Sequence, residues 1–193
     1  MYLLSATSFD DMIALYLKAE LTGRFGGEIE ALVEQEKASR AVVERPDTAN
    51  AADNTLRRRI LAGYRAYVFE DLPEQVQWHR ALLTRDDVAR VRYMDYSYWN
   101  ELSNHTRLPS VAAEVIRSGR EVFGVSNEGF LQAAQALRDG AHFPELIVVA
   151  ESLGSPLTFL EGHKRLTAYL LAPECLPEEL PVLIGFAPEC ARI

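Results

Sequence analysis

Five consecutive residues near the C-terminus combine an acid, a glycine and three side chains that can carry positive charge. They are Glu161, Gly162, His163, Lys164 and Arg165, here called the EGHKR turn, and they lie where the strand-like stretch PLTFLE gives way to the helix-like stretch HKRLTAYLLA. The first turn of a helix has unpaired N–H groups and the positive end of the helix dipole, so it binds anions, phosphate above all. The dipole disfavours cations there, and an anionic ligand would remove that conflict. The pattern therefore favours a phosphate- or nucleotide-binding turn.

Each side chain of the turn suits a phosphate site. Gly162 lets a ligand approach the backbone, and Lys164 and Arg165 supply positive charge, Arg165 with the geometry for bidentate contacts to phosphate. His163 can donate a hydrogen bond to a phosphate oxygen or act as an acid or base near neutral pH. Glu161 can hold a metal ion, accept a ribose hydroxyl or accept a proton. Glu161 and His163 are the candidate catalytic residues, and Gly162, His163, Lys164 and Arg165 are the candidate ligand-binding residues.

A structural interpretation of the same turn remains open. In that interpretation Glu161 caps the helix, Gly162 forms the turn, and the basic side chains face solvent. The spacing alone does not separate the two interpretations.

The elements that must position the turn follow one another in mixed order. PELIVVA is a continuous apolar run, which is typical of a strand covered on both faces. QVQWHRALL and LPVLIGF are further predicted strands, while SVAAEVIRSG and NEGFLQAAQALRDG predict helices closed by glycine. This order predicts an α+β domain with a small mixed sheet.

An all-helical segment is predicted ahead of this domain. Ser8 and Asp11 form a capping-box pattern before MIALYLKAEL, and a second helix is expected over residues 28–44. We expect a helical arm at residues 1–45, a linker or exposed loop at 46–53, and the α+β domain at 54–193.

Basic residues also occur together in the predicted helix NTLRRRILAGYRAYVF. Arg57, Arg58, Arg59 and Arg65 could form a basic patch, but consecutive residues on a helix fan over half its circumference. We therefore expect a solvated or salt-bridged face.

The stretch DYSYWNELSNHTR also contains many functional groups. Tyr96, Tyr98 and Trp99 could stack on a base, and Arg107 is a candidate phosphate ligand. The alternative is that Tyr98 and Trp99 are core residues on one face of a helix. A further capping box, Thr84 with Asp87, precedes an expected helix over VARVRYM.

The segment over residues 136–172 resembles the ParB/sulfiredoxin-like superfamily. In that superfamily a strand of the P-I-I-V type is followed by a strand that ends in an acidic residue or glycine, and a turn of the form D-G-H-x-R then opens a helix. Pro144 and residues 147–149 match the first strand, and the EGHKR turn matches the second motif. The chain is also similar to a small set of bacterial proteins that share YWNELS, TRLP and EGHxRLTAY strings.

The resemblance implies a nucleotide-binding fold whose ligand is a nucleoside triphosphate with magnesium. By match, Gly162, His163 and Arg165 hold the phosphates, and Lys164 matches less closely. His163 stands where sulfiredoxin needs a cysteine, which argues against reduction of a sulfinic acid. Too few residues follow Arg165 for the helix-turn-helix domain of partition proteins, which argues against chromosome partitioning.

Two functions are compatible with these observations. One is a nucleotide-dependent phosphotransferase or hydrolase in which Glu161 is the acid or metal ligand beside the phosphates. The other is a non-catalytic module that senses a nucleotide or binds a protein partner through the helices of residues 1–45. The second needs only the basic turn.

Composition narrows the remaining classes. The net charge of −8 argues against non-specific nucleic-acid binding, which depends on basic charge. Cys175 and Cys190 form no CxxC motif, and the four histidines lack zinc-site spacing, so no metal site is predicted. With no signal-peptide pattern and no apolar run long enough to cross a membrane, we expect a cytoplasmic protein.

Overall fold

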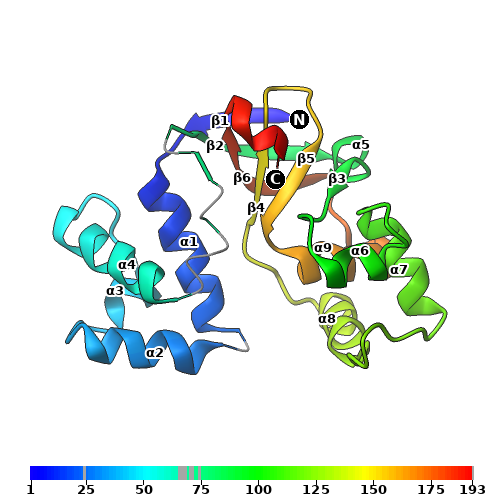
Figure 1. Cartoon of the computed structure of the whole chain (residues 1–193), viewed down its shortest axis with the longest axis horizontal. Coiled ribbons are helices and arrows are strands. Elements are labelled where there is room, and N and C mark those ends of the chain that lie inside the picture. The colour runs from blue at the N-terminus through cyan, green and yellow to red at the C-terminus, as the bar shows by residue number, and fades with distance from the viewer. Residues whose placement is uncertain (24, 65–68, 70–71, 74, 193) are drawn as a thin grey trace.

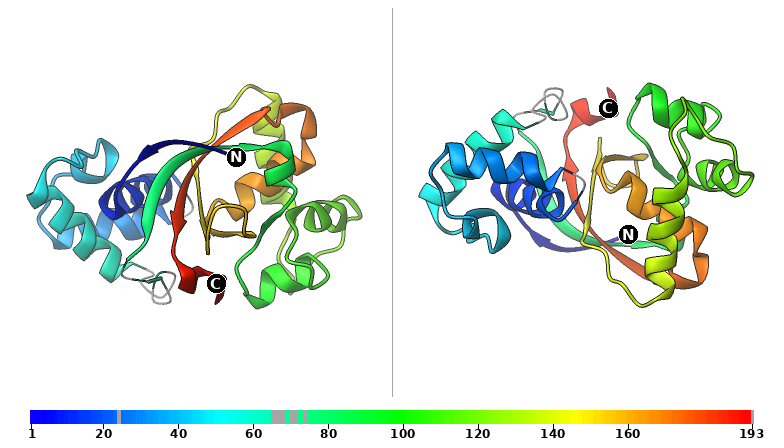
Figure 2. Two further views of the ribbon diagram at one scale, coloured as in Figure 1. Left: turned by 90° about the horizontal axis from the view of Figure 1, so that it is seen from above. Right: turned by 90° about the horizontal axis from the view of Figure 1, so that it is seen from below.

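A six-stranded mixed sheet lies between two groups of helices (Figures 1 and 2). The computed structural model describes residues 1–23, 25–64, 69, 72–73 and 75–192. The strands are β1 (Tyr2–Ala6), β2 (Gln77–Thr84), β3 (Val91–Arg92), β4 (Leu146–Ala150), β5 (Leu157–Glu161) and β6 (Glu179–Phe186), in the order β1-β2-β6-β4-β5-β3. The β6–β4 and β5–β3 pairs are parallel and the others antiparallel. The predicted α+β class with a mixed sheet is confirmed.

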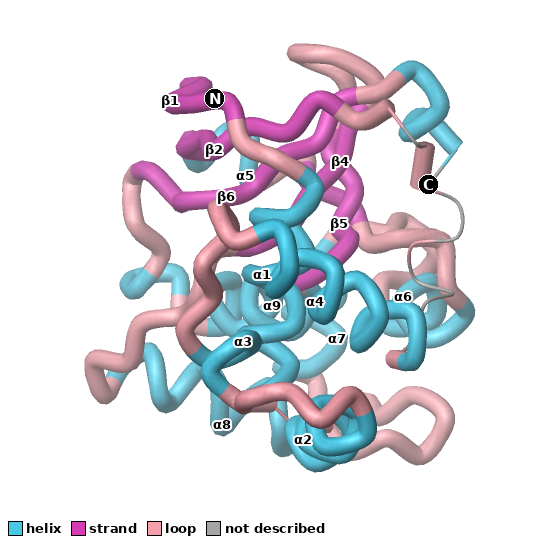
Figure 3. Tube along the Cα trace, turned by 90° about the vertical axis from the view of Figure 1, so that its left-hand side faces the viewer, coloured by secondary structure: helices cyan, strands magenta, loops and turns pink. Residues whose placement is uncertain are grey.

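The helices divide between the two faces of this sheet. The N-terminal helices are α1 (Phe9–Leu21), α2 (Gly26–Gln35), α3 (Ala41–Glu44) and α4 (Ala51–Gly63); they lie on the left in Figure 1, and Figure 3 shows the molecule from their side. The C-terminal helices are α6 (Ser97–Leu102), α7 (Pro109–Arg117), α8 (Glu128–Arg138) and α9 (His163–Leu171). A short helix, α5 (Arg85–Val88), links β2 to β3, and 3₁₀ turns lie at Pro173–Cys175 and Pro188–Arg192.

Strand β4 connects the two cores, because its side chains alternate between them. Leu146, Val148 and Ala150 pack in the core beneath the C-terminal helices, while Ile147 and Val149 pack in the core beneath the N-terminal helices. All five are at most 1% exposed. The prediction of an interior strand over PELIVVA is confirmed, and the two covered faces explain why its sequence shows no polar alternation.

The expectation that the N-terminal segment is all helical is wrong for residues 2–6. These residues form β1, which pairs antiparallel with β2 at the edge of the sheet. All five side chains of β1 are exposed, so the backbone pairing rather than side-chain burial defines the strand. Such a strand leaves no hydrophobic period in the sequence.

The helix predicted over residues 28–44 is interrupted. Lys37 adopts a left-handed φ of 52°, and Ala38 and Lys37 donate backbone hydrogen bonds to the carbonyls of Val33 and Glu34. This is the Schellman arrangement that ends a helix, here with lysine where glycine is usual. Helix α2 therefore ends at Gln35, and α3 forms a separate turn.

Both predicted capping boxes are present. The Ser8 hydroxyl accepts from the Asp11 N–H at the start of α1, and Thr84 does the same with Asp87 at the start of α5. The prediction of a helix over VARVRYM is wrong. The helix that follows Thr84, α5, ends at Val88, and Val91 begins β3, which pairs in parallel with β5.

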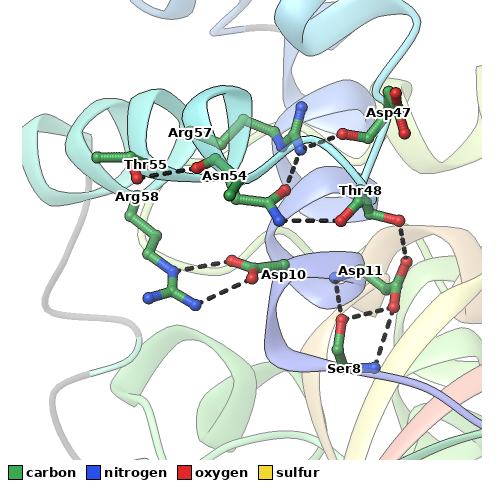
Figure 4. Close-up of polar contacts among 10 residues, drawn as sticks. Ser8, Asp10, Asp11, Asp47, Thr48, Asn54, Thr55, Arg57 and Arg58 are labelled. Atoms are coloured by element: carbon green, nitrogen blue, oxygen red, sulfur yellow. Dashed lines mark hydrogen bonds and ion pairs between the residues drawn. The ribbon is translucent and has the colours of Figure 1, made fainter.

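The predicted linker is tied to its surroundings by polar contacts (Figure 4). Thr48 donates to Asp11 over 2.7 Å, and Arg57 donates to the Asp47 carbonyl over 2.9 Å. Helix α4 begins at Ala51, with the Asn50 side chain as its N-cap, so the last three residues of the expected linker are helical.

The basic residues of α4 have internal partners. Arg57 is 1% exposed and donates to the Val42 carbonyl and to Asn54, which corrects the expectation that it lies on a solvated or salt-bridged face. Arg58 pairs with Asp10, and Arg59 with Glu36, as the salt-bridged alternative predicts. Arg65, the fourth arginine of the predicted patch, lies outside the described residues.

Candidate ligand-binding cleft

The EGHKR turn lies at a strand-to-helix junction, as predicted. Strand β5 ends at Glu161, Gly162 precedes α9 with φ +105°, and the helix begins at His163. A Cβ atom at position 162 would lie 2.5 Å from Cδ2 of Leu146. Glycine is therefore required here by the backbone conformation and by packing against β4, whether or not a ligand approaches.

The N-terminus of α9 opens into a cleft of about 860 Å³ between the two groups of helices. One wall comes from the end of α1 and the turn that follows it, and the other from α6, α8, α9 and the loop before β4. The lining residues are Ala19, Glu20, Thr22, Gly23, Phe25, Tyr98, Trp99, Val125, Ser126, Gly129, Phe130, Ala133, Phe143, Pro144, Glu161, His163, Lys164 and Arg165. The predicted opening of α9 into a concavity is confirmed.

Aromatic rings form much of the wall contributed by the C-terminal helices. Trp99 lies nearly parallel to both Tyr93 and His163, with ring centroids 4.6 and 4.9 Å apart. Tyr98 and Phe130 meet the indole edge-on. Trp99 and Tyr98 are each partly buried and line the cleft, so they combine the two roles that the sequence leaves open: packing in the core and exposure to a ligand.

His163 is buried within this aromatic group. Burial lowers its pKa to about 4, against the weaker opposing influence of Glu161, so the imidazole is neutral at pH 7. Its Nε2 is buried and has no hydrogen-bond partner among the described residues. At pH 7 His163 therefore does not supply a positive charge to the cleft, and its buried Nε2 keeps an unmet hydrogen-bonding capacity.

Arg165 is held by the protein itself. Its Nη1 donates to the carbonyls of Pro144 and Glu145, each over 2.9 Å, and its Nη2 donates to Glu161 over 2.8 Å. The Arg165 side chain is only 14% exposed. These contacts fasten α9 to the segment that leads into β4, and the three N–H groups they use are not available to a phosphate.

Glu161 and Arg165 neutralise each other at the cleft wall. The two side chains form an i,i+4 ion pair, and the Glu161 side chain is 24% exposed. The Glu161 carboxylate does not cap α9, because no side chain forms a hydrogen bond with the N–H groups at the start of this helix.

Lys164 differs from its neighbours because no described residue forms an ion pair or hydrogen bond with its ammonium group. The side chain crosses to α8, where a Cβ atom added to Gly129 would lie 2.7 Å from Nζ. Gly129 belongs to the first turn of α8, and Lys164 to the first turn of α9. The ammonium group thus lies where two helix N-termini meet at the cleft, and both termini favour anions.

Arg107 is not among the described residues that line the cleft. Its Nε donates to the Tyr93 carbonyl over 2.6 Å, its backbone N–H donates to Ser103, and its φ is +61°. Burial lowers the pKa of Arg107. Arg107 therefore supports the strand-to-helix connection behind the aromatic wall, and the structure does not bring it together with the EGHKR turn.

Several cleft residues were not predicted from the sequence. Phe25 and Glu20 come from the opposite wall, and Phe130 and Gly129 from α8. Glycine inside a helix costs about 0.5–1 kcal/mol relative to alanine. Gly129, in the first turn of α8, is therefore a sequence signal that this position has a packing or binding role. The Glu20 carboxylate accepts a hydrogen bond from the Tyr64 hydroxyl, which fixes its position at the rim.

Neither a metal-binding cluster nor a membrane-spanning helix is present in the part of the chain that the structure describes. Among the described residues, no group of three or more His, Cys, Asp or Glu side chains is arranged to hold a metal ion. None of the helices in the described ranges combines the length and the apolar character needed to cross a membrane.

Comparison of the chain with protein-family models, with curated proteins and with solved structures finds no match.

Proposed function

We propose that the protein binds a nucleotide in this cleft and acts as a binding or sensing module. The ring of the ligand packs against the aromatic wall around Trp99, and its phosphate lies at Lys164, between the N-termini of α8 and α9. The resemblance of residues 136–172 to the ParB/sulfiredoxin-like superfamily points to the same class of ligand.

The observation that carries the proposal is the ammonium group of Lys164. The neighbouring Arg165 is paired with Glu161 and with backbone carbonyls, whereas no described residue pairs with Lys164. Its position at two helix N-termini adds positive potential to a site already occupied by a cation. An anionic group bound there offsets that unfavourable arrangement.

The aromatic wall supports a ring-bearing ligand rather than free phosphate. Tyr98 and Trp99 are partly exposed aromatic side chains that line the cleft, and base–aromatic stacking contributes about 1–3 kcal/mol per base. His163 belongs to the same aromatic group, and its buried Nε2, which has no partner among the described residues, is the kind of polar group for which a partner is expected.

Binding is favoured over phosphoryl transfer by the state of the two candidate catalytic residues. Glu161 is paired with Arg165, and His163 is neutral and 8% exposed. The ligand would touch both the end of α1 and the start of α9, and so bridge the two groups of helices. That bridging suits a module whose N-terminal helices respond to the ligand or contact a protein partner.

The proposal is tested by titration calorimetry with adenine, guanine, cytosine and uracil nucleotides. Loss of a charge-assisted contact costs about 1.5–3 kcal/mol, so Lys164→Met should weaken binding roughly 10- to 150-fold. Lys37→Met is the matched control, because it removes the same charge from an exposed site that does not line the cleft.

Two results would overturn the proposal. One is a wild-type protein that binds none of these nucleotides. The other is equal weakening by Lys164→Met and Lys37→Met, which would reduce the effect of Lys164 to net charge alone.

A further inference from the structure

The two edges of the sheet differ in how they are protected from other chains. Strand β3, at one edge, is two residues long and includes Arg92. Strand β1, at the other edge, has five residues and contains neither a charged side chain nor a proline, and β2 is the one described strand that pairs with it. An edge strand presents unpaired N–H and C=O groups, and proteins usually protect such edges with short strands, charges or proline. The outer side of β1 lacks these protections and can pair with another strand.

The side chains of β1 are apolar and exposed. Tyr2, Leu3 and Leu4 are 57%, 43% and 60% exposed, and Phe9, at the start of α1, is 38% exposed. Four of the nine large hydrophobic side chains that are exposed among the described residues thus lie within the first nine positions. Figure 3 shows β1 at the margin of the sheet. An apolar patch of this kind, beside an unpaired strand edge, marks an interaction surface.

The absence of charge on this patch favours a second copy of the chain as the partner. Each copy has a net charge of −8, so two copies repel each other over most of their surfaces. Residues 2–9 contain no charged side chain, and the acid that follows them, Asp10, is paired with Arg58. Two copies can therefore meet at this patch without placing unpaired carboxylates opposite each other.

We propose that β1 pairs antiparallel with β1 of a second copy and joins the two sheets into one. Antiparallel pairing of a strand with its own copy obeys a twofold axis, because each copy then offers the same surface to the other. The outward N–H and C=O groups of one strand pair with those of the other, as in binding by strand addition. Tyr2, Leu3 and Leu4 pack near the axis and lose their exposure to water.

The dimer is expected to be weak. At about 200 Å² for each large side chain, the exposed fractions of the four apolar residues amount to roughly 400 Å² per copy. A stable interface buries about 800 Å² per partner. A register shift between Leu3 and Ser5 also limits the length of a continuous ladder. We therefore expect a dissociation constant on the order of 10 μM rather than in the nanomolar range.

Sedimentation velocity on the full chain without ligand, from about 1 to 300 μM, tests the proposal. The wild type should shift from monomer to dimer over this range. Leu4→Lys places a charge on the strand and close to its own copy, so it should weaken dimerisation at least tenfold. The matched control is Leu131→Lys, the same substitution at a 50% exposed leucine of α8, which should leave dimerisation unchanged.

Amide hydrogen exchange identifies the contact independently of any variant. Unpaired N–H groups at the outer edge of β1 exchange rapidly in the monomer and are protected when a second strand pairs with them. In the wild type, exchange within residues 1–8 should be slower at concentrations above the dimerisation midpoint than below it.

Four outcomes would overturn the proposal. A wild type that stays monomeric over the whole range would leave the edge of β1 to a strand of a different protein. Equal dimerisation of Leu4→Lys and the wild type, or a dimer in which exchange within residues 1–8 is not slowed, would place the interface elsewhere. Equal weakening by Leu4→Lys and Leu131→Lys would reduce the effect to net charge. Oligomers that grow beyond the dimer would contradict a closed twofold pairing.

Discussion

Two runs of basic residues look alike in the sequence and differ in the structure. Arg57, Arg58 and Arg59 lie in α4, and His163, Lys164 and Arg165 begin α9. In the first run each described side chain has a protein partner, either carbonyl groups or a carboxylate. In the second run only Arg165 is fastened in this way, while His163 is buried and neutral and Lys164 has no partner among the described residues.

The difference lies in what surrounds each charge. The N-terminal helices bring Asp10, Glu36 and the carbonyls of Val42 and Asp47 to the arginines of α4. The start of α9 instead faces the N-terminus of α8 and a wall of aromatic rings. The first run stabilises the fold, and the second leaves a charge for a ligand.

The largest expected effect in this comparison is on stability at Arg57. Arg57→Ala should lower the free energy of unfolding by about 3–5 kcal/mol, because it opens a cavity and leaves buried carbonyl groups unpaired. Arg58→Ala breaks only a surface pair with Asp10 and should cost less than about 1 kcal/mol. Urea unfolding of the two variants measures both values. Equal costs would mean that burial does not distinguish the two arginines.

A smaller effect is expected from acid at His163. Its pKa is about 4 in the folded protein and about 6.5 in an unfolded chain, so between these values the unfolded state binds more protons. Stability should be highest above pH 6.5 and should fall, by at most about 1.4 kcal/mol per pH unit, as the pH drops toward 4. His163→Phe should remove this part of the pH dependence.

The comparison region provides the control for that measurement. The destabilisation caused by Arg57→Ala should keep the same size over the same pH range, since the carbonyls that Arg57 binds do not titrate. An unchanged acid dependence in His163→Phe would show that the imidazole is not protected by burial.

The smallest stability effects are expected at Arg165 and Lys164, and they should differ between these two residues. Arg165→Met should cost about 1–2 kcal/mol, because it breaks three contacts with Glu161 and the segment before β4. Lys164→Met should change stability by less than about 0.5 kcal/mol. Thermal unfolding of both variants without ligand checks this contrast. A reversed order would assign the structural role to Lys164.

The sequence predicts the elements whose side chains carry a pattern. The apolar run of β4, the capping boxes at Ser8 and Thr84, and the junction at Gly162 all follow from local physical rules and are present in the structure. β1 and β3 could not be predicted in this way. Strand β1 is defined by backbone pairing with exposed side chains, and β3 by only two residues.

The sequence predicts where the candidate site lies, but it does not predict which residue of the EGHKR turn supports the fold and which is left for a ligand. The EGHKR turn lies at the cleft as its residue types indicated, yet Arg165, the residue best suited by type to bind phosphate, is fastened to carbonyls that lie 20 residues or more earlier in the chain. The ammonium group of Lys164 lies at the N-terminus of α8 because Gly129, on that helix, has no side chain to displace it. Such pairings depend on tertiary contacts, which no local pattern reports.

The central claim is that the ligand lies against Trp99 in the cleft, and the fluorescence of that residue tests it most directly. The chain contains two tryptophans, and Trp78 is buried in the other core with its indole N–H unpaired among the described residues, so Trp78→Phe leaves Trp99 as the single reporter. Titration with a nucleoside monophosphate should quench or shift its emission saturably, and Lys164→Met in the same background should move the midpoint at least tenfold higher. Calorimetric binding with no change in Trp99 emission would place the ligand elsewhere and contradict the account.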